Sequence, residues 1–114
     1  MIRLTSILCC VVASLQLEAQ LANGSFENIS SMPNGLGQWQ RAIGWTNAGS
    51  AIASPDLLNY NAVNACDLPE TSMGLVDSYD GDAVMGVAVC GRPTTNQREY
   101  ISTQLSKVMQ VGKP

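Results

Sequence analysis

The stretch DGDAVMGVAVCGRPTTNQREYISTQL, residues 80–105, carries the densest structural signal in the chain. It opens with an acidic Asp-Gly turn and continues into a nearly continuous apolar run at 82–90. A turn containing glycine and proline follows, and residues 99–105 then alternate, with one face formed by Ile101, Thr103 and Leu105. Alternation with a period of two predicts a β-strand, and a short apolar run between glycines predicts a strand covered on both sides. The stretch therefore predicts two strands joined by a turn.

Weaker strand signals flank this stretch. Residues 39–43 read as a short strand, residues 57–60 as either one helical turn or a short strand, and residues 61–78 as a long polar loop. Another segment begins at 108–111. With no long helical periodicity and about five strands, residues 20–114 predict an all-β domain, an antiparallel β-sandwich or jelly roll. Such folds use seven or eight strands, so we expect this one to be incomplete at its C-terminus.

The first nineteen residues have the pattern of a secretory signal peptide. Arg3 supplies the positive charge, residues 4–15 form the apolar run, and Ala19 is a small residue at a cleavage point. The run is too short to span a bilayer, so we expect no membrane span in the mature chain. A buried N-terminal helix is the alternative. The leader predicts export to the periplasm, the cell surface or the medium.

Charge and cysteine content narrow the class of protein. The net charge is -3 and the few basic residues are scattered, which argues against nucleic acid or an anionic membrane as a partner. Loss of the leader leaves two cysteines, Cys66 and Cys90. In an oxidising compartment these predict one disulfide, and two separately buried thiols are the alternative.

The chain lacks the residues of common catalytic arrangements. It contains no histidine, which excludes Ser-His-Asp and Cys-His catalysis. Its glycines do not form a phosphate-binding loop, and no spacing of carboxylates indicates a glycosidase. We therefore expect a binding or structural module that is not an enzyme.

The acidic turn DSYDGD at 77–82 is a candidate metal site. Carboxylate oxygens around a glycine turn suit a hard cation, so Asp80 and Asp82 predict a structural calcium site, with Glu27 as a further ligand. The alternative is a solvated acidic turn that precedes a strand.

Aromatic residues are the candidates for carbohydrate binding. Flat rings cover the apolar face of a sugar while polar side chains bind its hydroxyl groups. The candidate ligand-binding residues are Trp45, Tyr60, Tyr79 and Arg98. Trp39 and Trp45 are alternatively core residues, because a chain with one phenylalanine needs large side chains for packing. Tyr79, beside the acidic turn, is the aromatic residue most expected to be exposed.

Four segments together resemble a known family. NGSFE at 23–27, GWTNAGSAIASPDLLN at 44–59, DGDAVMGVAVCG at 80–91 and REYISTQL at 98–105 are similar to a galactose-binding-like jelly-roll domain of exported Bacteroidetes cell-envelope proteins. Members include carbohydrate-binding modules and often adjoin a peptidoglycan-binding or gliding-type sorting domain. The resemblance implies a structural calcium near the first strand, and only Glu27 matches a ligand by position. In that family a further strand follows the VGK-like turn, which this chain lacks.

Two functions remain open at this stage. The first is a secreted module that binds a glycan or cell-wall polymer or acts in cell-surface adhesion. The second is a purely structural or interaction domain of a cell-envelope protein with no glycan ligand.

Overall fold

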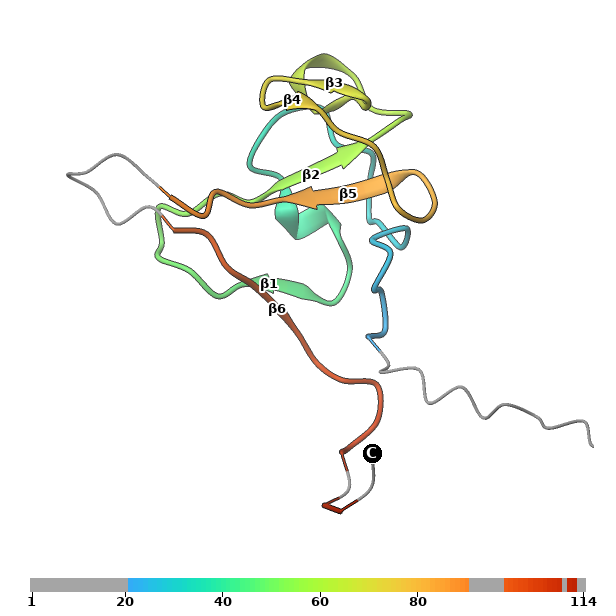
Figure 1. Ribbon diagram of the computed structural model, residues 1–114, viewed down its shortest axis with the longest axis vertical. Helices are drawn as coiled ribbons and strands as arrows, with labels where there is room; N and C mark the ends of the chain where they lie inside the picture. The colour runs from blue at the N-terminus through green and yellow to red at the C-terminus, as the bar shows by residue number, and fades with distance from the viewer. Residues whose placement is uncertain (1–20, 91–97, 110, 113–114) are drawn as a thin grey trace, which may run out of the picture.

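The computed structural model describes residues 21–90, 98–109 and 111–112 of the 114 residues (Figure 1). The predicted signal peptide lies outside the described residues. The described residues form an all-β fold with three small antiparallel sheets of two strands each. Its elements in chain order are η1 (Trp39–Arg41), β1 (Trp45–Asn47), β2 (Asp56–Asn59), η2 (Asn64–Cys66), β3 (Glu70–Thr71), β4 (Gly74–Leu75), β5 (Ala83–Gly86) and β6 (Ile101–Thr103). No helix in the described part of the chain has the length and hydropathy needed to cross a membrane.

The β2–β5 ribbon is the centre of the fold because both of its faces are covered. Leu57 and Leu58 are consecutive in β2, so their side chains point to opposite faces, and each is at most 1% exposed. Leu57 packs with Ala42 and Ala83 in one apolar cluster, while Leu58 packs with Cys66 and Leu68 in another. The prediction of a strand covered on both sides is thus confirmed for β5, whose Met85 and Val84 contact the two clusters.

The β1–β6 ribbon lies on the other side of η1 from the β2–β5 ribbon (Figure 1). Trp45 is paired with Thr103 and Thr46 with Ser102, in an antiparallel register. Ile101 and Thr103 are half-buried and Ser102 is exposed, which confirms the predicted alternation within β6. The strand predicted over 99–105 is shorter, and Leu105 is exposed. Of the two forms predicted for the segment at 57–60, the structure has the strand, β2.

A carboxylate connects the two ribbons at one end. The Glu99 backbone N–H donates to the Ala88 carbonyl at 2.8 Å, and Glu99 Oε2 accepts the Ala88 N–H at 2.9 Å. Glu99 Oε1 accepts a third N–H, from Ser54, at 2.8 Å. Since Ala88 follows β5, Ser54 precedes β2 and Glu99 precedes β6, one side chain holds three segments together.

The apolar run after β5 does not continue as a strand. Regular pairing ends at Gly86, although the sequence predicted a strand to Cys90. Val87 is exposed and Val89 is 72% exposed, because β2 begins at Asp56, the partner of Gly86, and offers no residue opposite them. The apolar composition of 87–90 therefore does not reflect burial within the described chain.

Residues 39–41 form the 3₁₀ turn η1, which corrects the strand predicted for 39–43. The Arg41 N–H donates to the Gln38 carbonyl and the Ala42 N–H to the Trp39 carbonyl. Gly37 and Gly44 on either side have φ of 73° and 84°, a left-handed conformation that glycine adopts readily. The left-handed residues Gly37 and Gly44 are only seven positions apart, so the segment between them is too short for an extended strand.

The long loop predicted at 61–78 contains a 3₁₀ turn and a β-hairpin. The 3₁₀ turn η2 places Cys66 in the second apolar cluster, and β3 and β4 form a short hairpin. Asp67 also makes a parallel bridge to Asn59 at the end of β2. The segment predicted from 108 is not a strand at the described residues 108–109.

Asn23 organises the N-terminal segment, a role that the Asn-Gly turn signal did not reveal. Its side chain is 6% exposed, and its Nδ2 donates to the carbonyls of Asn28 and Ile43 at 2.8 and 3.0 Å. Its Oδ1 accepts the Asn28 N–H at 3.0 Å. A buried amide is stable when its donors and acceptor are satisfied in this way.

The carboxyl group of Asp56 makes stability depend on pH. Burial raises its pKa above the ordinary value of 3.8, the Gly37 N–H bond opposes that rise, and the negative charge of Glu99 adds to it. Because the pKa is raised in the folded state, the contribution of Asp56 to stability is fully present below pH 3.8 and is lost as the pH rises through the folded-state pKa.

We therefore expect Asp56→Asn to increase the free energy of unfolding at pH 7, because the amide oxygen can still accept the Gly37 N–H without carrying a charge. The gain should shrink as the pH falls toward 3.8. Urea unfolding of both proteins across this range measures the difference. A difference that is the same at pH 7 and at pH 4 would contradict the assignment.

Candidate functional site

The acidic turn at 77–82, which we call the Tyr79 turn, is fastened to the N-terminal segment by Glu27. The carboxylate oxygen Oε1 of Glu27 accepts the backbone N–H groups of Asp82 and Ala83, both at 2.8 Å. These residues lie 55 and 56 positions away in sequence. Hydrogen bonds to a charged acceptor are stronger than neutral ones, so this contact fixes the start of β5 relative to residue 27.

Glycine at position 81 is required by this contact. Gly81 has a φ of 68°, and a Cβ atom placed on it would lie 2.4 Å from Glu27 Oε1. The Ser78 hydroxyl donates to the Gly81 carbonyl, which closes the turn on itself. The Asp-Gly pair thus supplies the left-handed conformation and the space in which the glutamate sits.

Residues that follow β2 hold the two ends of the turn. The Tyr60 hydroxyl donates to Asp77 Oδ1, and the Tyr60 N–H donates to the Asp82 carbonyl at 3.0 Å. The Asn61 amide donates to Asp82 Oδ2 at 3.2 Å. The turn is therefore held by hydrogen bonds to Tyr60 and Asn61, which follow β2, and to Glu27 of the N-terminal segment.

Tyr79 is the most exposed residue of this turn. Its side chain has 105% of the exposure of a free tyrosine, so the whole ring is open to solvent. Asp77, Asp80 and Asp82 around it are also exposed. An aromatic ring on a turn with so many internal hydrogen bonds is a rigid flat surface surrounded by hydrogen-bond acceptors.

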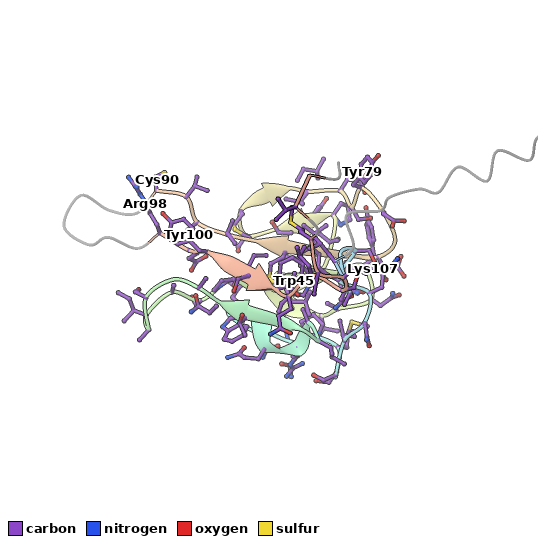
Figure 2. All side chains as sticks on the ribbon, turned by 90° about the horizontal axis from the view of Figure 1, so that it is seen from below. Trp45, Tyr79, Cys90, Arg98, Tyr100 and Lys107 are labelled. Atoms are coloured by element: carbon purple, nitrogen blue, oxygen red, sulfur yellow. The ribbon has the colours of Figure 1, made fainter. Side chains whose placement is uncertain are left out.

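The four predicted ligand-binding residues do not come together. Tyr60 and Tyr79 belong to the same turn and its support, but Figure 2 shows Arg98 at the opposite end of the domain from Tyr79. Trp45 lies between them and packs in the core, with its ring centroid 4.8 Å from that of Phe26. Its Nε1 donates to the Asn23 carbonyl at 2.7 Å. Only Tyr79 and its surroundings therefore have the character of a surface site.

The predicted calcium ligands belong to the Tyr79 turn or contact it, but they are not arranged as a metal site. Glu27 reaches it through backbone N–H groups, and Asp82 is bonded to the Asn61 amide. In the part of the chain that the structure describes, no group of three or more acidic or cysteine side chains could hold a metal ion. Oε1 of Glu27 accepts two backbone N–H groups, and calcium at Glu27, Asp80 and Asp82 stays a prediction.

Cys66 and Cys90 are both free thiols in this structure, which shows no disulfide between them. The Cys66 side chain is buried beside Leu58 and Leu68, and its thiol donates to the Val63 carbonyl at 3.0 Å. Cys90 is exposed at the end where Arg98 and Tyr100 lie (Figure 2). The count of two cysteines could not show that one of them belongs to the core.

We expect one thiol of residues 20–114 to react with Ellman's reagent in the native state and the second only in denaturant. Burial raises the pKa of the Cys66 thiol, which keeps it in the unreactive protonated form. Cys90→Ser should abolish the rapid reaction, and Cys66→Ser should leave it intact. The absence of any reactive thiol without reductant would instead support the disulfide.

No protein-family model matches the chain, and no curated protein or solved structure is significantly similar to it. The site geometry is therefore the basis for a functional proposal.

Proposed function

We propose that this chain is an exported, non-catalytic β-sandwich module that binds carbohydrate through the Tyr79 turn, in a role such as cell-surface adhesion. The observation that carries the proposal is a fully exposed tyrosine ring on a turn fastened by Glu27, Tyr60 and Asn61. Exposure of an apolar ring to water is unfavourable. When the apolar face of a sugar stacks on the ring, both apolar surfaces are removed from water. The Asp80 and Asp82 carboxylates accept hydrogen bonds from sugar hydroxyls.

The rigidity of the turn favours binding. A ligand that stacks on a mobile loop loses affinity because the loop must be ordered first, whereas a turn already fixed by hydrogen bonds avoids that cost. The leader pattern at 1–19 favours export of the module to a place where glycans and cell-wall polymers are available. The proposed fold is a jelly roll, supported by the antiparallel pairing in the β2–β5 and β1–β6 ribbons and by the four segments quoted above.

Substitution of Tyr79 tests the proposal. We expect Tyr79→Ala to weaken glycan binding by at least about tenfold, because aromatic anchors carry much of the energy at binding surfaces. The melting temperature should stay within about 2 °C of the wild type, since exposed residues contribute little to stability. The measurement is a glycan array followed by calorimetry on any glycan retained.

Tyr100→Ala is the matched control, because Tyr100 is also exposed but lies at the opposite end of the domain (Figure 2). It should leave binding unchanged. No retained glycan across a broad array, or equal loss with both variants, would overturn the proposal.

The second candidate is a structural or interaction domain of a cell-envelope protein with no glycan ligand. One observation favours it: the structure brings together only two of the four predicted ligand-binding residues. Under this alternative the Tyr79 turn is a surface feature and no glycan is retained.

A further inference from the structure

We propose that the Tyr79 turn accepts uncharged glycans and rejects acidic ones, such as those containing uronate or sulfate groups. This inference rests on the proposed carbohydrate binding and adds the class of ligand. It follows from the position of Tyr79 on an acidic turn that no positive charge in the described residues neutralises.

Four carboxylates belong to the turn that carries the exposed ring or contact the backbone at its end. Asp77, Asp80 and Asp82 belong to the turn, and Glu27 contacts its backbone. The donors that these carboxylates have within the described chain are all neutral: the Tyr60 hydroxyl, the Asn61 amide and the N–H groups of Asp82 and Ala83. These donors orient the carboxylates without cancelling their charge.

Basic residues are absent from the sequence around the turn. No lysine or arginine occurs between residues 42 and 91. Arg98 lies at the opposite end of the domain, and Lys107 is on the segment that leaves the domain after β6 (Figure 2). An acidic sugar stacked on Tyr79 therefore meets like charges, with no counter-charge from the part of the chain that the structure describes. Rejection of wrong partners by like charge is a common source of specificity.

The hydroxyl groups of a neutral sugar are attracted to these carboxylates, because a hydroxyl group can donate a hydrogen bond. Each carboxylate offers two oxygen acceptors, and the Asp80 side chain is exposed. A sugar hydroxyl donates to a carboxylate in a charge-assisted hydrogen bond, whereas a uronate group brings only acceptors to the same place. The same residues thus bind the hydroxyl form and repel the carboxylate form of one sugar.

The test compares ligands that differ only in charge. Cello-, manno- and galacto-oligosaccharides of equal length are presented together with the same oligosaccharides oxidised at C6 to uronates. We expect the wild type to bind a neutral member about tenfold more tightly than its oxidised form at low salt. The Debye length falls from about 30 Å at 0.01 M to about 3 Å at 1 M, so the difference should shrink in high salt.

Asp80→Asn and Asp80→Glu separate charge from shape. Asp80→Asn should raise affinity for the oxidised form about threefold, whereas Asp80→Glu, which keeps the charge, should leave it low. Equal binding of neutral and oxidised forms by the wild type would overturn this inference and leave carbohydrate binding intact. Absence of binding to every oligosaccharide would overturn both proposals, and selective binding of the oxidised forms would overturn this one alone.

Discussion

Leu57→Ala should destabilise this domain more than any other single substitution that we predict, by about 3 kcal/mol. Leu57 is 0% exposed and packs between Ala42 and Ala83, with Phe26 and Trp45 against the same cluster. Truncation to alanine removes buried methyl groups and leaves a cavity that neighbouring backbone segments cannot fill. A domain of this size has about 5 to 14 kcal/mol of stability in total, so the loss is a large fraction.

Urea unfolding followed by tryptophan fluorescence measures this effect, because Trp45 packs on the affected cluster. Ile52→Ala is the matched control: it also shortens a branched aliphatic side chain, but Ile52 is 66% exposed. It should change the free energy of unfolding by less than about 0.5 kcal/mol. If both variants unfolded at the same urea concentration as the wild type, the result would contradict a core that covers both faces of β2.

Glu27→Ala should cost about 2 kcal/mol, since two hydrogen bonds to one charged acceptor are lost together. The Ala83 N–H belongs to a buried residue and would be left without its acceptor, whereas water can replace the bond to exposed Asp82. The loss also frees the Tyr79 turn from the N-terminal segment. Glycan affinity should therefore fall together with stability.

Glu27→Gln keeps the Oε1 acceptor without the charge and should cost about half as much. Glu70→Ala removes an exposed carboxylate from β3 and should be nearly neutral. Gly81→Ala should act like Glu27→Ala, because its Cβ would occupy the position of Glu27 Oε1. Thermal unfolding of the four variants distinguishes a specific effect of the hydrogen bonds to Glu27 from a general effect of surface charge. A general effect of charge would make Glu27→Ala and Glu70→Ala equally destabilising.

Local patterns predicted β5 and β6, offered β2 as one of two alternatives, and did not predict β1, β3 or β4 or where the strands end. The alternation around Ile101 and Thr103 reports burial of one face, and it is present in β6. The valines after Gly86 have the same composition as β5, yet no partner strand reaches them. A strand end depends on the length of its neighbour, which is set by residues some thirty positions away.

The candidate site was predicted in part. The Asp-Gly turn and the exposure of Tyr79 follow from local sequence, because short polar turns with glycine lie on the surface. Glu27 was singled out as a metal ligand, and the structure shows its Oε1 accepting the backbone N–H groups of Asp82 and Ala83. A carboxylate serves either purpose, and the choice depends on whether N–H groups or a cation face it, which only the tertiary structure reveals.

The roles of Trp45 and Asn23 depend on contacts across the fold. Trp45 is one of two tryptophans and could have been a sugar platform, but its indole donates to the Asn23 carbonyl and its ring packs on Phe26. The Asn23 side chain in turn bonds to Ile43, twenty residues later. Such pairs have no signature in the spacing of residues along the chain.

Backbone amide chemical shifts of isotopically labelled protein, recorded by NMR during titration with a glycan retained on the array, test the central claim most directly. The account predicts that the signals of Tyr79, Asp80 and Asn61 move with one common dissociation constant, while those of Arg98 and Tyr100 stay in place. Shifts confined to the end of the domain that carries Arg98, or no shift at any glycan concentration, would contradict it.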